Sequence, residues 1–181
     1  MEKLSLAMSI IALCLYCLSY FFSKKSHYLV LQLTGNVFLS LSYCFIGEYF
    51  TMIAVFIGIF RGLICYTFEK KNKKVPIPVI VGICAVTVSC YVIINYVIFS
   101  AASMWDFLYL FASCMYAVTF SIRNIRVMRY AVLVPHTSAV VYNLLIAAPI
   151  TSAVSYAIEL GVTVLAIVRF EIFGRKKKSN Q

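Results

Sequence analysis

Two ionisable residues lie inside long apolar segments, where a charge has chemical consequences. Arg61 lies within AVFIGIFRGLICYTF, residues 54–68, and Glu159 lies within the last apolar segment of the chain. An arginine at the centre of a membrane helix costs about 2.5–3.5 kcal/mol on insertion scales. Because of this cost, such residues usually have a partner or line a hydrated path, and each is treated as a candidate functional residue.

Other polar residues recur at three- and four-residue spacing in the same segments, which places them on one face of each helix. At 1.5 Å per residue from the outer helix ends, Asn36, Arg61, His136 and Glu159 fall at a depth of about 14–18 Å. Half of a hydrocarbon core is about 15 Å, so the sequence predicts a polar layer near mid-membrane. The predicted substrate-binding residues are Gln32, Asn36, Arg61, Tyr116, His136, Asn143 and Glu159.

Two of these residues have more than one interpretation. Arg61 can pair with Glu159 across the bundle, or it can extend about 10 Å along its own helix to the cytoplasmic surface. His136 follows Pro135, which removes a backbone hydrogen bond and can kink its helix. The histidine can therefore either contact a ligand or cap the backbone groups that the proline frees.

The composition places these residues in a membrane protein. Of 181 residues, 63% are hydrophobic and 12% are charged, with a mean hydropathy of +0.94. A soluble domain of this length cannot bury so much apolar surface. In that context the net charge of +10 concerns topology and gives no indication of nucleic-acid binding. The seven cysteines lie in apolar segments, which argues against a disulfide framework.

Seven segments are long and apolar enough to cross a bilayer. They are residues 4–22, 28–46, 49–68, 77–99, 105–121, 127–147 and 150–171. The first has no small-residue cleavage site after it, so we expect it to remain as a helix. Basic residues cluster in alternate connections and in the tail, which predicts an outside N-terminus and a cytoplasmic C-terminus.

The segments before and after the fourth are similar in pattern, with an offset of about 99 residues. We therefore expect an all-α membrane protein with a parallel three-plus-one-plus-three arrangement. The predicted parts are a first three-helix bundle (1–75), a linker helix (76–103), a second three-helix bundle (104–174) and a basic cytoplasmic tail (175–181). Parallel repeats of this kind occur in transporters that bind substrate between the halves.

The leading functional prediction is a transporter or facilitator for a small polar or zwitterionic solute, working by alternating access. The alternative is a membrane receptor or assembly factor that binds a peptide or a lipid headgroup without transport. Motifs such as H-E-x-x-H and G-x-S-x-G are absent from the sequence, so we expect no enzyme, no catalytic residues, no metal and no cofactor. The expected partners are the lipid bilayer and a solute, not nucleic acid, and a homo-oligomer stays open.

The segments SKKSHYLVLQLTGNVFLSLSYCFIGEYFTMIAVFIGIFRGLICYTFEKK and VYNLLIAAPITSAVSYAIELGVTVLAIVRFE resemble the YgjV family of bacterial inner-membrane proteins. The likeness rests on Gln32, Tyr43–Gly47, Arg61, Tyr142–Asn143 and Arg169. That family is similar to the SWEET, PQ-loop and PnuC group of small transporters, which implies the same three-plus-one-plus-three fold. The sequence departs from that group because it lacks the Pro-Gln pair and has no proline in its first, second and fifth helices, which argues against a SWEET-like proline hinge.

Overall fold

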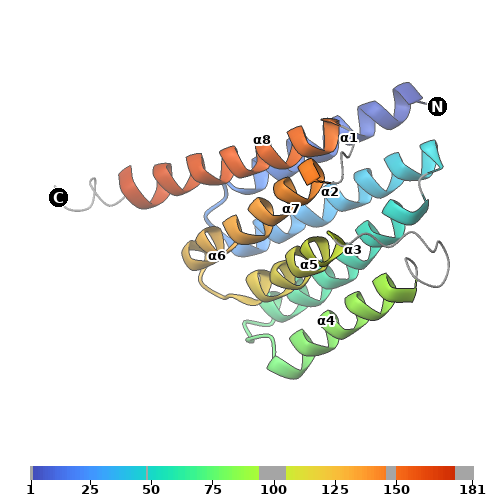
Figure 1. Ribbon diagram of the computed structural model, residues 1–181. Coiled ribbons are helices and arrows are strands. Elements are labelled where there is room, and N and C mark those ends of the chain that lie inside the picture. Colours follow the sequence, from blue (N-terminus) through green and yellow to red (C-terminus); the bar gives the residue numbers. More distant parts are fainter. Residues whose placement is uncertain (1, 48, 94–104, 146–149, 174–181) are drawn as a thin grey trace.

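The described part of this computed structural model, residues 2–47, 49–93, 105–145 and 150–173, contains helices and turns and no strand (Figure 1). The helices are α1 (Glu2–Ser19), α2 (Lys25–Ile46), α3 (Tyr49–Lys70), α4 (Ile77–Val92), α5 (Asp106–Ser121), α6 (Ile125–Ala131), α7 (Leu133–Leu145) and α8 (Ile150–Ile167), and a π-helical turn, Val168–Phe173, continues α8. The all-helical prediction is confirmed. The end of the predicted fourth segment (94–99) and the basic tail (175–181) lie outside the described residues.

Local sequence signals explain where several helices begin and end. Gly47 adopts a left-handed conformation, with φ of 77°, and its N–H bonds the carbonyls of Cys44 and Tyr43, which ends α2. Pro76 and Pro78 occupy the start of α4, where a missing N–H costs little. The Asn124 side chain accepts a hydrogen bond from the backbone N–H of Arg126 and caps α6.

The sixth predicted segment is not one helix. It divides into α6 and α7, with Val132 between them. Pro135 lies four residues after Ala131, the last residue of α6, and a proline cannot donate a hydrogen bond to the carbonyl four residues earlier. The interruption agrees with the kink that Pro135 predicts in this segment, and residues 146–147 lie outside the described residues.

The packing follows the order of the helices along the chain. Helix α2 packs against both α1 and α3, and α7 packs against both α5 and α8. We call α1, α2 and α3 the first set, and α5, α7 and α8, with the short α6 that leads into α7, the second set. The two sets meet where α1 contacts α8 and where α3 contacts α5, while α4 packs mainly on α5. The helices run roughly side by side, and the start of α1 and the end of α8 lie at opposite ends of the bundle (Figure 1).

The surface of the bundle is apolar, and much of its interior is polar. Large hydrophobic side chains are exposed on many of the helices, including Leu6 at 60%, Phe60 at 57% and Leu165 at 60%. The buried polar residues are Ser5, Ser19, Lys25, Gln32, Ser42, Thr87, Thr119, Arg129, His136, Glu159 and Thr163. This arrangement is the opposite of a soluble bundle and is typical of a protein surrounded by lipid.

Fewer helices are long enough to cross a bilayer than the seven membrane-spanning segments that the sequence predicts. Within the described residues, one helix, Lys25–Ile46, is both at least 18 residues long and apolar enough to cross a bilayer. Lys3–Ser19, Ile77–Val92 and Phe107–Ser121 are apolar but shorter. The structure is consistent with a helical membrane protein, and the count of seven spans stays a prediction.

Some of the buried apolar residues form a cluster at one end of the bundle. We call it the basic end because the turns after α1, α3 and α5 there carry lysine and arginine. This basic-end cluster consists of Tyr20, Tyr28, Leu29, Cys65, Val75, Phe120, Met128, Val132 and Ala166. Two polar contacts reinforce the same end. Lys25 Nζ lies 3.1 Å from Glu69 Oε2, and Arg129 Nη2 donates to the carbonyl of Phe22 at 2.7 Å.

Candidate functional site

A cavity of about 120 Å³ lies between the two sets of helices. Its walls come from α1, α2, α3, α5, α7 and α8, and neither α4 nor α6 contributes a lining residue among the described ones. The lining residues are Tyr16, Gln32, Asn36, Val55, Gly58, Arg61, Tyr109, Ala112, Ser113, Tyr116, Phe120, His136, Ala139, Tyr156 and Glu159. A cavity with this many polar and ionisable walls is the default candidate for a binding site.

Arg61 extends from α3 toward α5. Its Nη1 donates to the backbone oxygen of Ser113 at 2.8 Å, and its guanidinium carbon lies 5.3 Å from the centre of the Tyr116 ring and 5.6 Å from that of Phe120. These contacts are a neutral carbonyl and two aromatic faces, which stabilise a cation without neutralising it. Arg61 Nε is buried and has no hydrogen-bond partner among the residues that the structure describes.

Neither interpretation of Arg61 from the sequence matches this geometry. Within the described residues, Arg61 and Glu159 form no ion pair, although both line the cavity. The guanidinium also points away from the basic end, because Nη2 lies 3.6 Å from the place where Gly58 would carry a Cβ. Gly58 precedes Arg61 by one turn, whereas the basic end follows it, so the side chain runs in the usual direction back along its helix.

Asn36 lies beside Arg61 and is oriented by α1. Tyr16 Oη donates to Asn36 Oδ1 at 2.8 Å, which leaves both N–H groups of the amide available. The Asn36 amide nitrogen lies 3.8 Å from the same Cβ position of Gly58. Donors from Arg61 and Asn36 therefore converge over Gly58, where the absence of a side chain leaves space.

Gln32 is held one turn before Asn36 on α2. Its Nε2 donates to Ser19 Oγ at 2.9 Å, and Ser19 Oγ donates in turn to the backbone oxygen of Tyr16 at 2.6 Å. Both residues are buried. This chain of bonds ties α1 to α2 beside the cavity, as do Ser5 and Ser42 near the other end of the same two helices.

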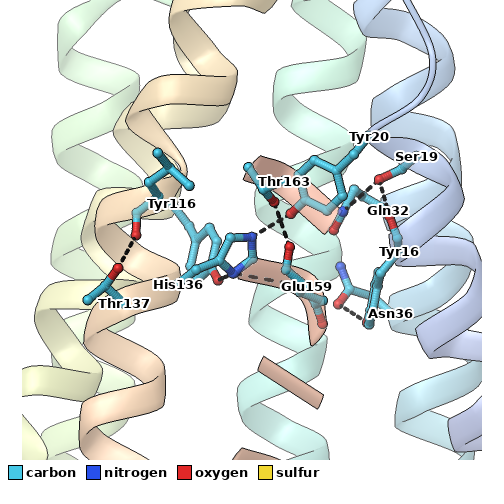
Figure 2. Close-up of polar contacts among 11 residues, drawn as sticks. Tyr16, Ser19, Tyr20, Gln32, Asn36, Tyr116, His136, Thr137, Glu159 and Thr163 are labelled. Atoms are coloured by element: carbon cyan, nitrogen blue, oxygen red, sulfur yellow. Dashed lines mark hydrogen bonds and ion pairs between the residues drawn. The ribbon is translucent and has the colours of Figure 1, made fainter. Parts of the chain in front are cut away.

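His136 is held between two tyrosines (Figure 2). Its Nε2 lies 2.5 Å from Tyr20 Oη, and its Nδ1 lies 2.7 Å from Tyr116 Oη. A neutral imidazole has one donor and one acceptor nitrogen, so one hydroxyl donates to the ring and the other accepts from it. The ring therefore does not cap the backbone groups freed by Pro135, and that interpretation of the histidine is wrong.

Glu159 enters the cavity from α8 and is only 8% exposed. Its Oε2 lies 3.9 Å from His136 Nδ1, too far for a hydrogen bond (Figure 2). In the described part of the chain, no donor makes a hydrogen bond to either side-chain oxygen, and Thr163 donates only to the backbone oxygen of this residue. The carboxyl group is thus a buried acceptor whose capacity is unused.

The structure brings six of the seven predicted binding residues to the wall of one cavity: Gln32, Asn36, Arg61, Tyr116, His136 and Glu159. The seventh, Asn143, lies on α7, and its side chain is outside the described residues. Binding of a solute by this set stays a prediction.

The binding set predicted from the sequence leaves out four tyrosines of the site. Tyr16, Tyr109 and Tyr156 line the cavity, and Tyr20 holds His136. Tyr20 stands beside a basic turn at the end of an apolar segment, a position typical of an interfacial anchor, so nothing in the sequence distinguished it. Tyr156 lies one turn before Glu159 on α8, and the three- and four-residue spacing could have identified it.

The site offers charge recognition and hydrogen bonding. It has one guanidinium, one carboxyl group, amide groups and tyrosine hydroxyls around a small space. Within the described residues, no group of three or more histidine, cysteine or acidic residues is placed to hold a metal ion, and all seven cysteines are free thiols. The arrangement can bind and orient a small polar molecule.

Comparison with known proteins gives one family. A family model for a bacterial inner membrane protein, Imp-YgjV, matches residues 3–172. No curated protein and no solved structure matches the chain.

Proposed function

Because the chain belongs to the Imp-YgjV family of bacterial inner membrane proteins, we propose that it carries a small polar solute across that membrane. The observation that carries this proposal is the cavity, because its lining comes from helices of both sets of three and converges on charged and amide groups. Ionisable residues inside a membrane protein are costly and usually mark a path for a solute or an ion.

An internal repeat supports a transporter of the parallel-repeat type. Tyr16 bonds Asn36 in the first set of helices, and Tyr116 bonds His136 in the second, at residue numbers that are each 100 higher. The contacts between the sets have the same symmetry, because the first helix of each packs on the third helix of the other. We therefore propose the three-plus-one-plus-three arrangement, with α4 as the linker, and the relation to the SWEET, PQ-loop and PnuC group.

Alternating access requires one side of the site to close while the other opens. The basic-end cluster contains residues from both sets, and Arg129 of the second set donates to Phe22 of the first at the same end. By the positive-inside rule this end is cytoplasmic. On our proposal the described conformation is therefore closed toward the cytoplasm, and transport requires these contacts to separate.

The test is uptake by the full-length protein in vesicles of phosphatidylethanolamine and phosphatidylglycerol. The probes are four labelled solutes of the same shape and different charge: L-alanine, lactate, alaninamide and lactamide. We expect protein-dependent uptake of at least one of them, and its loss in Arg61→Ala. Equal uptake by protein-containing and empty vesicles for all four solutes would refute transport of small solutes of this kind.

The non-transporting alternative predicts a different result. A receptor or assembly factor on the same fold would bind its ligand at the cavity without uptake. Stoichiometric binding of one of the four solutes with no flux above that of empty vesicles would therefore favour the alternative over transport.

A further inference from the structure

The cavity is lined by an arginine and a glutamate that form no ion pair with each other. Arg61 contacts a backbone carbonyl and two aromatic rings, and Glu159 has only the His136 ring at 3.9 Å. Within the described residues, neither has an ion pair with a residue of permanent opposite charge. Charged groups removed from water are stable only when they are paired and hydrogen-bonded, so each of these groups lacks a partner that a ligand can supply.

The Arg61 side of the cavity is suited to a carboxylate. Arg61 Nη2 and the Asn36 amide nitrogen lie 3.6 and 3.8 Å from the Cβ position that Gly58 leaves empty. An oxygen atom in the cavity beside that position, at van der Waals distance from the Gly58 backbone, can accept hydrogen bonds from both groups. Arginine binds carboxylates well because its N–H groups form a planar fork. The hydrogen bond from Tyr16 Oη to the amide oxygen of Asn36 orients this side chain, so that its N–H groups stay available to a ligand.

The Glu159 side is suited to an ammonium group. The His136 nitrogens are already bonded to two tyrosine hydroxyls, so they do not satisfy the carboxyl oxygens of Glu159. The rings of Tyr116 and Tyr156 also line this cavity, and aromatic faces attract ammonium groups. An ammonium group can donate up to three hydrogen bonds. It can therefore bond the Glu159 carboxyl oxygens, which accept no hydrogen bond within the described residues.

The size of the cavity limits the ligand. A dry cavity of about 150 Å³ in another protein binds benzene, a molecule of about six non-hydrogen atoms. The cavity here, of about 120 Å³, is of the same order. It therefore accommodates a molecule the size of glycine, alanine or β-alanine.

From these observations we infer that the cavity binds a small zwitterion, with its carboxylate at Arg61 and Asn36 over Gly58 and its ammonium group at Glu159. The inference rests on the proposed function and specifies its substrate class. When Glu159 is ionised, its carboxylate and the Arg61 guanidinium balance, so a ligand with both poles leaves no charge uncompensated, whereas a ligand with one pole does.

The test uses the purified full-length protein in detergent at pH 7 and calorimetric titration with the same four solutes. Alanine has both poles, lactate lacks the ammonium group, alaninamide lacks the carboxylate and lactamide lacks both. We expect alanine to bind about tenfold or more tightly than any other, since a hydrogen bond to a charged group is worth at least this much. Equal binding of lactate or lactamide would overturn the inference.

Two charge-removing variants test which residue binds which pole. Glu159→Gln should weaken the binding of alanine by about tenfold or more and strengthen the binding of lactate. Arg61→Gln should weaken the binding of alanine and strengthen the binding of alaninamide. Glu69→Gln is the matched control, because it removes a carboxylate at the basic end, outside the cavity, and should leave alanine binding unchanged. Unchanged alanine binding in both cavity variants would overturn the inference, and the wild-type solute comparison stands even if a variant does not fold.

The outcomes separate this inference from the proposed function. If alanine binds with the predicted pattern but is not carried into vesicles, the zwitterion site stands and transport fails. If lactamide is bound and carried while alanine is not, transport stands and the zwitterion site is refuted.

Discussion

Replacing Gly58 by alanine adds a methyl group to the cavity without a steric clash. The new Cβ would lie 3.6 Å from Arg61 Nη2 and 3.8 and 3.9 Å from the side-chain amide atoms of Asn36, which are ordinary van der Waals distances. A methyl group is close in size to a water molecule, whose share of liquid volume is about 30 Å³. The substitution therefore fills roughly a quarter of a cavity of about 120 Å³, at the place assigned to the carboxylate.

The expected result is a protein that is more stable and binds its solute less well. Alanine is favoured over glycine within a helix by about 0.5–1 kcal/mol, which corresponds to a rise of about 1–4 °C in Tm for a chain of this size. Loss of the carboxylate subsite should weaken alanine binding by about tenfold or more. Thermal unfolding in detergent measures the first quantity, and calorimetric titration measures the second.

Gly82→Ala is the matched control. Gly82 lies within α4, and nothing lies within 4 Å of its Cβ position. The variant should show a similar rise in Tm with alanine binding unchanged. If Gly58→Ala raises Tm and binds alanine like the wild type, the space over Gly58 is not part of the site. If it lowers Tm, the steric argument itself is wrong.

Two further predictions concern the groups that position the site. A Cβ at Gly35 would lie 2.5 Å from Tyr16 Cε1. Gly35→Ala should therefore lower the free energy of unfolding by about 1–3 kcal/mol and weaken solute binding. A variant as stable as the wild type would contradict the close packing of α1 on α2. Tyr20→Phe and Tyr116→Phe each leave one nitrogen of His136 unpaired. Each should lower the free energy of unfolding by about 1–3 kcal/mol, measured by thermal or denaturant unfolding. This loss should disappear when His136 is also replaced by phenylalanine in a double-mutant cycle.

The helical pattern was predictable to a large extent because it follows from local rules. Apolar length, basic turns and the prolines at the start of α4 placed the helix ends within a few residues of those observed. The break between α6 and α7 was not predicted as such, although Pro135 indicated a kink. Hydrophobicity alone does not distinguish one long helix from two short ones that are joined by a single residue.

The membership of the site was also largely predictable. Polar residues at similar depth on different helices have few alternatives to facing the interior, since lipid is a poor environment for them. Depth and helix face therefore predicted six of the lining residues, including Arg61 and Glu159. They did not predict Tyr20, because a tyrosine near a basic turn is equally suited to the membrane surface.

The sequence by itself determined that this is a membrane protein surrounded by lipid, where its helices lie and which polar residues they carry. These features depend on composition and on spacing along one helix. Only the tertiary structure decided the partners: Arg61 bonds Ser113 and not Glu159, and His136 is held by Tyr20 and Tyr116. Partner choice depends on how each helix is rotated and which helix it faces. Those quantities are set by packing between residues distant in the chain, and a depth estimate contains neither of them.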